Sequence, residues 1–438
     1  MKGWFETDLS ADIKNMVLLF EYNHHGYSKE LAALLKGRGH SCVLITNEHD
    51  EATTGLYNEV CISKEILNSN ELEKLVKKIC KEKNVSSVLN IVDTMSFTHA
   101  RLLESMGLLS DVIKGLYCSR NKFIARKLLG KAGLSHVKYH LIRSAEDLKD
   151  AASQIRYPAV LKPVGGYGSY FVHKVTHEGE LFDKYNIIRS ELGHMPEKRS
   201  DFDFHWDGVK YNAMDDLLLE EYIPGDEFTV DGFVSRNEVQ IVALHQKIGS
   251  TEDDGFRDNF YLTPPQNLSE AKLADIRDFV SKAVRTVGLE RSIFHVEMKV
   301  KEDGGMEIIE VNPRLGGGTV RDNILNLTRI DMLDVYLDVM LGDKIPELSY
   351  EKSGIAFGCG VLVNKSGRVK NIQGVDIVKK LPQVRQLKVV YPVGSVIPSV
   401  DGEEYHVLVS CLCKSFDEAI EIKDKIQNTI SVEMGGIW

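Results

Sequence analysis

Residues 294–318 read FHVEMKVKEDGGMEIIEVNPRLGGG, and this pattern predicts a β-hairpin. Apolar and polar residues alternate in the first half with the period of two that is typical of a half-buried strand. Asp303-Gly304 is a strong signal for a two-residue turn, because both residues of such a turn need a positive φ. A hairpin closed by that turn places Glu297 directly opposite Glu310.

Two carboxylates that face each other across a β-ladder, roughly 5 Å apart at Cβ, repel each other. Either the pKa of one carboxyl rises, or a cation lies between them. Asn312 is expected on the same face as Glu310, together with Met306 and Ile308. Its amide oxygen and the two carboxylates suit Mg²⁺ that also binds phosphate oxygens. The alternative is an exposed hairpin with solvated acids, and the Asn-Pro-Arg-Leu-Gly-Gly-Gly run at 312–318 favours the metal site.

Composition describes an ordinary globular protein of 438 residues, 43% hydrophobic and 27% charged, which is long enough for two to four domains. The net charge is −10 and no basic block is present, so nucleic-acid binding is not expected as a main role. The seven cysteines form no CxxC pair and predict reduced thiols in a cytoplasmic protein. No apolar run is long enough to span a membrane, and the first residues lack the apolar core of a signal peptide.

The first hundred residues alternate strand-like and helix-like runs, which predicts a parallel sheet with helices on both faces. Strands are expected at 15–21, 42–46 and 86–93, and helices at 28–40, 71–84 and 97–109. The first turn lacks the GxGxxG fingerprint of dinucleotide binding. It carries His24 and His25, which we interpret as part of a polar loop rather than as ligand contacts.

A helix is expected from Ser119, acting as N-cap, to Gly133, and Lys122 lies in its first turn. A lysine there opposes the helix dipole, which hints at an anionic ligand. Lys162 ends an apolar run, and a glycine-rich loop between two strands follows it. Backbone N–H groups in such a loop can approach phosphates closely, and a nearby lysine adds a point charge. The loop residues concerned are Gly165, Gly166, Gly168 and Ser169.

The middle of the chain predicts further strands at 217–219, 227–234 and 238–249 and an amphipathic helix at 268–287. Residues 195–214 and 251–267 are polar and aperiodic, and we interpret them as loops that could close over a site. Residues 323–342 have helical spacing. The last 90 or so residues predict short strands separated by glycine turns and one closing helix, a compact α+β cap.

Taken in order, these segments resemble the ATP-grasp superfamily of carboxylate–amine ligases, and most closely its L-amino acid ligase branch. The likeness rests on Lys122, VLKPVGGYGS, LLLEEYIPGDEF, HVEMKV and IIEVNPRLGGG, and it covers roughly residues 15–438. It implies a mixed α/β and α+β architecture with an ATP-grasp fold. The implied domains are a Rossmann-like N-terminal domain (1–117), an ATP-grasp domain (118–348, with a small lobe at 118–225) and a C-terminal α+β cap (349–438).

The resemblance also implies a role for each matching position. Lys122 and Lys162 would hold ATP phosphates, and the loop from Gly165 to Ser169 would fold over them. The adenine would contact Glu220 and the backbone of Glu221, Tyr222 and Ile223, and the ribose would contact Glu227. Mg²⁺, or Mn²⁺ in its place, would be held by Glu297, Glu310 and Asn312. Arg314 would face the transferred phosphoryl group, and we count Arg314 and Lys162 as catalytic.

Activation of a carboxylate fits this set of residues. An amine does not displace an oxide from a carboxylate at neutral pH, whereas it attacks an acyl phosphate. Phosphoryl transfer needs positioning and neutralisation of charge, which the lysines, Arg314 and Mg²⁺ would supply. For the substrates, Arg321 could pair with a carboxylate, and His245 and Arg257 lie on segments that should border the acyl site. The expected partners are small molecules, with no nucleic acid and no membrane, and the resemblance suggests a homodimer.

Three alternatives remain. A bicarbonate-activating enzyme of the biotin-carboxylase type would share the nucleotide site, but the cap motif of that family is not visible in SGIAFGCGVLV at 353–363. A D-alanine–D-alanine ligase would carry a serine-rich phosphate loop unlike VGGYGS. A non-catalytic nucleotide-binding regulator would have no reason to keep the complete set of site residues.

Overall fold

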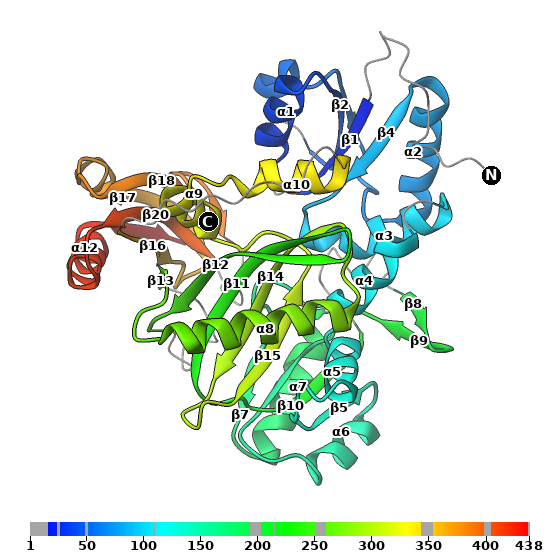
Figure 1. Cartoon of the computed structure of the whole chain (residues 1–438), viewed down its shortest axis with the longest axis vertical. Helices are drawn as coiled ribbons and strands as arrows, with labels where there is room; N and C mark the ends of the chain where they lie inside the picture. Colours follow the sequence, from blue (N-terminus) through cyan, green and yellow to red (C-terminus); the bar gives the residue numbers. More distant parts are fainter. Residues whose placement is uncertain are drawn as a thin grey trace.

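The computed structural model describes residues 16–23, 27–48, 51–107, 110–192, 203–213, 215–249, 260–342, 354–397 and 404–436. The described residues form a four-stranded parallel sheet near the N-terminus, a four-stranded and an eight-stranded sheet that are antiparallel, and two smaller sheets. Figure 1 shows the eight-stranded sheet at the centre, the N-terminal sheet above it and the second four-stranded sheet below it. His24 and His25 lie outside the described residues.

The N-terminal sheet has the strand order β3-β2-β1-β4 and confirms the predicted parallel arrangement. Its strands are β1 (Met16–Glu21), β2 (Ser41–Thr46), β3 (Glu59–Ile62) and β4 (Val85–Leu89). The helices are α1 (Ser28–Gly37), α2 (Ser69–Glu82) and α3 (Ser96–Ser105). Sequence analysis missed β3, because it is a short edge strand without a continuous apolar run.

The next two helices, α4 (Ser110–Arg120) and α5 (Lys122–Lys131), correct the predicted helix start. Ser119 belongs to the last turn of α4, where its hydroxyl donates to the carbonyl of Leu116 at 3.2 Å. The N-cap of α5 is Asn121, whose side chain accepts from the amide of Ile124 at 2.9 Å. Lys122 is therefore the first residue of a helix, beside a sharp bend of the chain.

The second four-stranded sheet has the order β5-β10-β6-β7 and forms the small lobe with α6 (Ala145–Ala152) and α7 (Glu178–Leu192). Its strands are β5 (Tyr139–Ile142), β6 (Ala159–Pro163), β7 (His173–Val175) and β10 (Leu217–Glu221). Part of the predicted 195–214 loop is a hairpin, β8 (Asp203–Trp206) and β9 (Val209–Asn212), so the loop prediction is wrong there. Residues 195–202 and 214 lie outside the described part of the chain.

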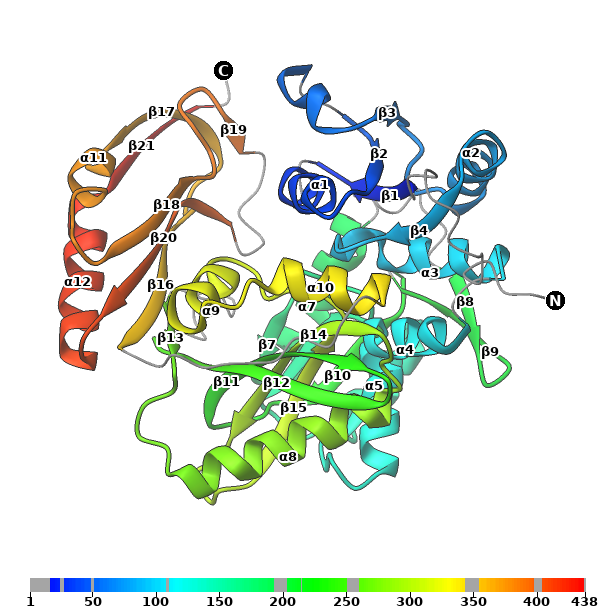
Figure 2. The same cartoon turned by 45° about the horizontal axis from the view of Figure 1, so that its top comes forward.

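The eight-stranded sheet runs β15-β14-β11-β12-β13-β16-β20-β18. Helix α8 (Glu270–Val287) covers one face, and α10 (Met332–Leu341) packs on the other, between this sheet and the N-terminal sheet (Figures 1 and 2). The strands are β11 (Asp226–Ser235), β12 (Glu238–Lys247), β13 (Phe260–Thr263), β14 (Ser292–Val300), β15 (Met306–Asn312), β16 (Ile355–Leu362), β18 (Val384–Val389) and β20 (Tyr405–Cys413).

Two predictions for this region need correction. Residues 260–263 of the predicted 251–267 loop form β13, which joins β12 to β16, while residues 251–259 lie outside the described residues. Residues 323–342 do not form one helix, because Arg329 adopts a left-handed φ of 64° and ends α9 (Val320–Thr328). Asp331 then caps α10 by accepting from the amide of Leu333.

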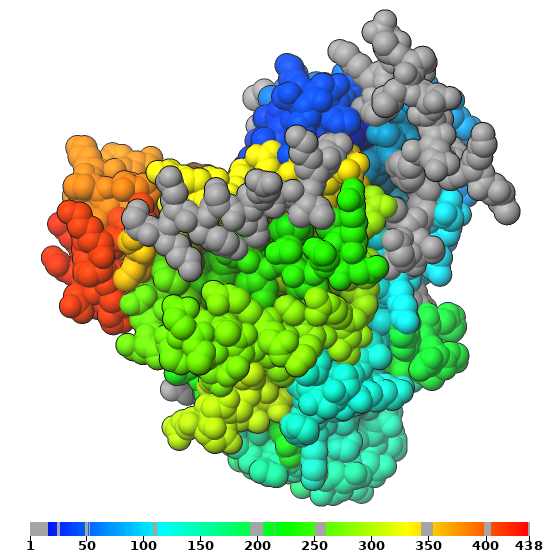
Figure 3. Space-filling view, viewed as in Figure 1, coloured from blue at the N-terminus to red at the C-terminus, as the bar shows by residue number. Residues whose placement is uncertain are grey.

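The C-terminal part adds a three-stranded sheet, β19-β17-β21, to the strands that it contributes to the large sheet. Its elements are β17 (Gly367–Gln373), α11 (Val375–Val378), β19 (Val396–Ile397), α12 (Phe416–Thr429) and β21 (Ser431–Gly435), as the predicted strand-rich cap with a late helix requires. The C-terminal residues, orange and red, and the N-terminal residues, blue, form separate flanks of the molecule in Figure 3. No helix of the described residues is long and apolar enough to cross a membrane.

The hairpin β14–β15 confirms that Glu297 lies opposite Glu310, although the predicted turn is wrong. Met298 pairs with Ile308 and Val300 with Met306, so five residues, 301–305, connect the strands. The register shifts between Glu297 and Met298, where Ile309 is the extra residue of a β-bulge. The five-residue connection shifts the strand register by one residue from the predicted register, and the bulge shifts it back at Glu297 and Glu310. The bulge also moves Met306 and Ile308 off the face of Glu310, since Ile308 is fully buried in the core.

Candidate functional site

Most of the predicted nucleotide and metal residues line one cleft between the small lobe and the eight-stranded sheet. About 960 Å³ of space, part of it open to solvent, lies between the walls of this cleft. The predicted residues on its wall are Lys122, Lys162, Gly166, Gly168, Ser169, Glu220, Glu221, Tyr222, Ile223, Glu227, Glu297, Glu310 and Arg314. The residues that line the cleft do not include Gly165 and Asn312, nor the proposed substrate residues Arg321 and His245.

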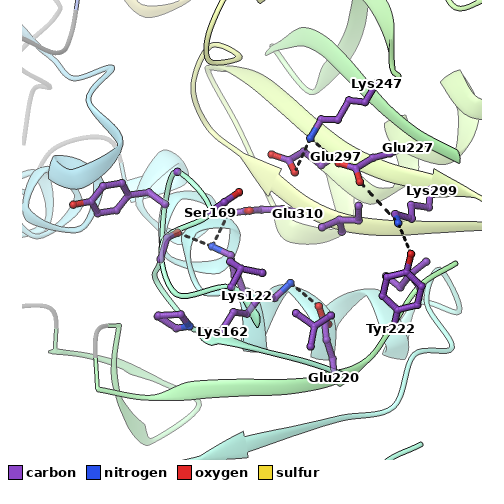
Figure 4. Close-up of a pocket in the computed structure, with 18 of the residues that line it drawn as sticks. Lys122, Lys162, Ser169, Glu220, Tyr222, Glu227, Lys247, Glu297, Lys299 and Glu310 are labelled. Carbon is purple, nitrogen blue, oxygen red and sulfur yellow. Dashed lines mark hydrogen bonds and ion pairs between the residues drawn. The ribbon is translucent and has the colours of Figure 1, made fainter. Parts of the chain in front are cut away.

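Most of the charged side chains of the cleft are paired with one another (Figure 4), whereas Arg314 and Glu221 contact Asp93 and Arg156, which do not line the cleft. Its wall carries the cations Lys122, Lys162, Lys247, Lys299 and Arg314 and the carboxylates Glu220, Glu221, Glu227, Glu297 and Glu310. An anionic ligand must therefore exchange existing ion pairs for new ones, because the formal charges on the wall balance.

At the inner end of the cleft, Glu220 lies between Lys162 and Arg126. Its two oxygens contact Lys162 Nζ at 2.5 Å and Arg126 Nε at 2.9 Å. Burial raises the pKa of the Glu220 carboxyl, but the two cations outweigh burial and lower it overall. Arg126 also donates to the carbonyl of Ile308 at 2.6 Å, so it connects Glu220 to the bulge of β15. This ionised Glu220 is a hydrogen-bond acceptor.

Glu297 and Glu310 form the carboxylate pair of the large sheet. Lys122 Nζ lies 2.8 Å from Glu310 and Lys247 Nζ lies 3.6 Å from Glu297. Burial raises the pKa of Glu297, but Lys247, His295 and other nearby cations lower it to about 2. Glu297 is therefore ionised at neutral pH, as a metal ligand must be. Burial lowers the pKa of Lys122, which Glu310 partly offsets.

Asn312 is fully buried beside this pair, and its amide oxygen accepts from Arg120 at 3.3 Å, while its Nδ2 has no hydrogen-bond partner. The described residues contain no cluster of three or more His, Cys, Asp or Glu side chains that could hold a metal ion. Two carboxylates and one amide oxygen nevertheless fit a hard divalent cation whose remaining ligands are phosphate oxygens.

Arg314 reaches the cleft beside Asp93, which begins a short 3-10 helix (Asp93–Met95) four residues after the end of β4. Asp93 contacts Arg314 Nε at 2.7 Å with one oxygen and Arg120 Nη1 at 2.9 Å with the other. Burial raises the pKa of Asp93, but the two arginines lower it to about 2. Arg120 is 1% exposed and also donates to the carbonyl of Gly165 at 3.2 Å. One carboxylate of the N-terminal domain thus holds two guanidinium groups at the end of the cleft.

At the outer end, Glu227 lies among cations. Lys247 donates to its Oε1 at 2.6 Å, and Lys299 lies 4.0 Å from its Oε2. Lys299 also donates to the hydroxyl of Tyr222 at 3.1 Å, and Lys174 lies 4.4 Å from the centre of the Tyr222 ring. Glu227 is thus an oriented acceptor that can bind hydroxyl groups.

The glycine loop between β6 and β7 curves over the cleft and is held on its inner side. Lys122 Nζ donates to the carbonyl of Gly166 at 2.6 Å. A side chain at Gly165 would collide with Ala213, since its Cβ would lie 2.6 Å from the Ala213 Cβ. Gly168 has a φ of +55°, the left-handed region that glycine adopts at no steric cost. The loop therefore approaches Lys122 as a phosphate-binding loop requires.

The predicted substrate residues do not gather at the cleft. The guanidinium of Arg321 forms two hydrogen bonds with Asp331, at 2.8 and 2.6 Å, in the forked geometry that was expected for a substrate carboxylate. His245 is fully buried, with Nδ1 2.6 Å from the hydroxyl of Thr263 and Nε2 3.3 Å from Asp231. Arg257 lies outside the described residues.

Sequence analysis missed several charged residues of the site, namely Asp93, Arg120, Arg126 and Lys299. The positions of two of them could have been predicted from the spacing of residues along a helix and along a strand. Arg126 follows Lys122 by one helical turn and so shares its face, and Lys299 shares the strand face of Glu297. Asp93 and Arg120 meet through contacts between distant segments, which no local pattern reveals.

Residues 155–322 match the family model described as the ATP-grasp domain. The chain is 25% identical over 261 residues to the alanine–anticapsin ligase of Bacillus subtilis (strain 168), covering 57% of this chain and 52% of that protein. It is 22% identical over 413 residues to the carbamoyl phosphate synthase large chain of Caldanaerobacter subterraneus subsp. tengcongensis, covering 90% of this chain and 35% of that protein. The chain thus spans about a third to about half of the length of these relatives.

Among solved structures, the fold is similar to that of an L-amino acid ligase from Bacillus licheniformis. The TM-score is 0.80 at 19% sequence identity, and the match covers 97% of this chain and 100% of that one. The family match and this similarity confirm the predicted ATP-grasp fold.

Proposed function

We propose that this chain, whose residues 155–322 match the model of the ATP-grasp domain, is an ATP-dependent carboxylate–amine ligase. It would convert a carboxylate, in our proposal that of an amino acid, to an acyl phosphate and couple it to an amine, in our proposal that of a second amino acid. ADP and phosphate are the other products. The observation that carries the proposal is the single cleft in which two facing carboxylates, Glu297 and Glu310, lie among five cations under a glycine loop.

The nucleotide would lie along the cleft from Glu220 to Glu310. Glu220 would accept from the adenine amino group, with Glu221, Tyr222 and Ile223 along the ring edge. Glu227 would bind the ribose hydroxyls, because its contacts with Lys247 and Lys299 orient its carboxylate. Lys122 and Lys162 would bind phosphate oxygens under the loop of Gly165, Gly166, Gly168 and Ser169. Each lysine would exchange its glutamate for a phosphate.

Glu297 and Glu310 would hold Mg²⁺ or Mn²⁺, and Asn312 would join them by turning its amide oxygen away from Arg120. The partnerless Nδ2 of Asn312 supports such a rearrangement. A divalent cation bound there would neutralise part of the charge on the phosphates.

Arg314 would face the transferred phosphoryl group. Asp93 orients its guanidinium from behind, and the arginine stays charged because Asp93 outweighs the effect of burial on its pKa. A fixed cation stabilises charge that develops in the transition state without reorganisation of the site. The glycine loop would keep water from the acyl phosphate, which an amine must reach before hydrolysis.

A bicarbonate-activating reaction is a second candidate, supported by the similar fold of the biotin carboxylase domain of Hydrogenobacter thermophilus 2-oxoglutarate carboxylase, whose structure contains bicarbonate (TM-score 0.70, 16% identity). It would use the same nucleotide site with a smaller acyl substrate. The two candidates differ in the compound that makes ATP consumption rise.

The test is phosphate release with ATP and Mg²⁺ over pairs of amino acids and over bicarbonate, with product masses measured in parallel. Phosphate release that needs two amino acids, with a product mass equal to their condensation, supports the ligase. Release that needs bicarbonate alone supports the second candidate, and ATP binding without release in any mixture would refute both. Lys162→Met should abolish release, whereas Lys149→Met, an exposed lysine of the same lobe, should not.

We propose a cytoplasmic location, because all seven cysteines are free thiols, five of which are buried. We propose a homodimer on the basis of the resemblance alone. Light scattering after size-exclusion chromatography gives the mass in solution, to be compared with 49.2 kDa for one chain.

A further inference from the structure

The glycine loop is joined to the C-terminal part of the chain by one carboxylate. Glu404 directly precedes β20, and its Oε1 accepts from the hydroxyl of Tyr170 at 2.8 Å. Its Oε2 accepts from the hydroxyl of Tyr391 at 2.6 Å. Tyr170 directly follows Ser169 in the glycine loop, and 234 residues separate it from Glu404. The contact thus connects two regions that are distant in the sequence.

The loop needs such a contact because its backbone is unfavourable. Ser169 and Phe171, on either side of Tyr170, have φ values of 54° and 60°, in the left-handed region that non-glycine residues rarely adopt. The side chain of Phe171 is buried in the core, which fixes the far side of the turn. The near side, Gly168 and Ser169, lines the cleft. Between Ser169 and Phe171, the hydroxyl of Tyr170 donates a hydrogen bond to Glu404.

The hydroxyl of Tyr170 remains a donor at all ordinary pH values. Burial raises the pKa of Tyr170, and the negative charge of Glu404 raises it further. Tyr391 restrains the second oxygen of Glu404, and its own pKa is raised in the same way. A hydrogen bond to a carboxylate is stronger than one between neutral groups, and a carboxylate that is held at both oxygens has little freedom to move away.

We infer that Glu404 is a positioning residue that holds the glycine loop closed over the phosphate end of the cleft, through the hydroxyl of Tyr170. Neither residue lines the cleft, so their effect on a ligand is indirect. The inference rests on the proposed function, since it takes the ligand under the loop to be the phosphates of ATP. It adds to that function a part for the C-terminal cap in retaining the nucleotide and protecting the acyl phosphate.

Loss of the contact has two expected consequences. A loop that opens more often lets nucleotide leave faster. It also admits water, which attacks the acyl phosphate to give back the carboxylate and release phosphate without any amide. The ratio of phosphate to amide product then rises above one.

Tyr170→Phe removes the hydroxyl and keeps the ring, and Glu404→Gln keeps the shape and removes the charge. Tyr185→Phe, on α7 of the same lobe, is the matched control. Amide hydrogen exchange of residues 165–172 is measured first, in the ligand-free protein, so that the loop is followed without catalysis. Dissociation of a fluorescent ATP analogue and the ratio of phosphate to product are measured next, with thermal melting as a check of the fold.

In Tyr170→Phe and Glu404→Gln, exchange of the loop amides and dissociation of the nucleotide should each accelerate about tenfold, the scale of one charge-assisted hydrogen bond. KM for ATP should rise more than kcat falls, and the double variant should be no worse than either single variant. Unchanged loop exchange, or additive effects of the two substitutions, would overturn the inference. A wild-type protein that binds no nucleotide would instead refute the proposed function.

Discussion

Replacing Glu310 with glutamine is expected to tighten the binding of metal-free ATP and to remove most of the advantage that Mg²⁺ gives. In the structure, Glu310 holds the ammonium of Lys122 at 2.8 Å and lies opposite Glu297. It therefore has two opposite effects on a nucleotide. It keeps a lysine away from the phosphates when no metal is present, and it supplies half of the carboxylate pair that would bind the metal.

The size of the first effect follows from the ion pair. A hydrogen bond to a charged group contributes roughly 1.5–3 kcal/mol. If Lys122 turns fully to a phosphate once Glu310 is neutral, metal-free ATP should bind roughly 10- to 100-fold more tightly. Two carboxylates at about 5 Å repel each other by roughly 3 kcal/mol at an effective dielectric constant of about 20, and the substitution removes this term as well. A metal ion bound to the variant would therefore gain no stabilisation from relieving the repulsion between Glu297 and Glu310.

Titration calorimetry with ATP, in EDTA and in excess Mg²⁺, measures both effects. The quantity to compare is the ratio of the two dissociation constants. Glu227→Gln is the matched control, because it also removes the ion pair of a cleft lysine, Lys247, at 2.6 Å, but the residue opposite Glu227 in the ladder is Lys299 and not a carboxylate. That variant should alter both dissociation constants alike and leave their ratio near the wild-type value.

The reasoning is refuted if Glu310→Gln weakens metal-free ATP binding, or if its ratio of dissociation constants equals that of the wild type. The first result would mean that Lys122 does not reach a phosphate. The second would mean that the metal binds elsewhere. An unchanged melting temperature in both variants is needed to compare them, since burying an unpaired lysine is costly.

Three further outcomes are expected. Arg314→Ala should lower kcat by at least about 100-fold with little change in ATP affinity, since the arginine would act on the transition state, and an unchanged kcat in phosphate-release assays would remove its role. Asp93→Asn should lower kcat more than it raises KM for ATP, because Asp93 orients Arg314 without lining the cleft, and equal changes in both constants would contradict this. His99 is buried, and burial lowers its pKa to about 4, so the unfolded chain takes up a proton between pH 6.5 and 4 that the folded chain does not. Unfolding free energy should therefore fall by about 3 kcal/mol over that range, and His99→Gln should abolish this loss in urea titrations.

The hairpin shows how far local sequence patterns reach. Alternation of apolar and polar residues correctly predicted the hairpin strands, and the confirmed pairing of Glu297 with Glu310 was inferred from a turn at Asp303-Gly304. The turn was placed wrongly, because Asp303-Gly304 lies in a five-residue connection, and Gly304 alone has a positive φ, of 82°. A bulge at Ile309 restored the pairing. Arg126 binds the carbonyl of Ile308 beside that bulge, and no pattern within the hairpin contains this information.

The same limit explains the helix that begins at Lys122. Serine and asparagine are both good N-caps, so the sequence SRNK allows a helix to begin after either one. The structure uses Asn121, because the preceding helix α4 runs on to Arg120 and buries that arginine against Asp93 and Asn312. The choice between the two caps is thus made by tertiary contacts of a neighbouring residue, which a scan of local preferences does not include.

Arg321 illustrates why charged residues are poor guides to a ligand until their neighbours are known. Its position after the triple glycine suggested that it binds a substrate carboxylate, yet the carboxylate that fills its fork is Asp331 of the same chain. Lys122 and Lys162 are equally well paired, with Glu310 and Glu220, and differ from Arg321 because both line the cleft. A pair on the wall of a cleft can be exchanged for a ligand at the cost of one ion pair. Arg321 and Asp331 do not line this cleft, and their ion pair connects α9 to the N-cap of α10. Access to the cleft, more than charge or spacing, is therefore the criterion by which we propose Lys122 and Lys162 as binding residues in preference to Arg321.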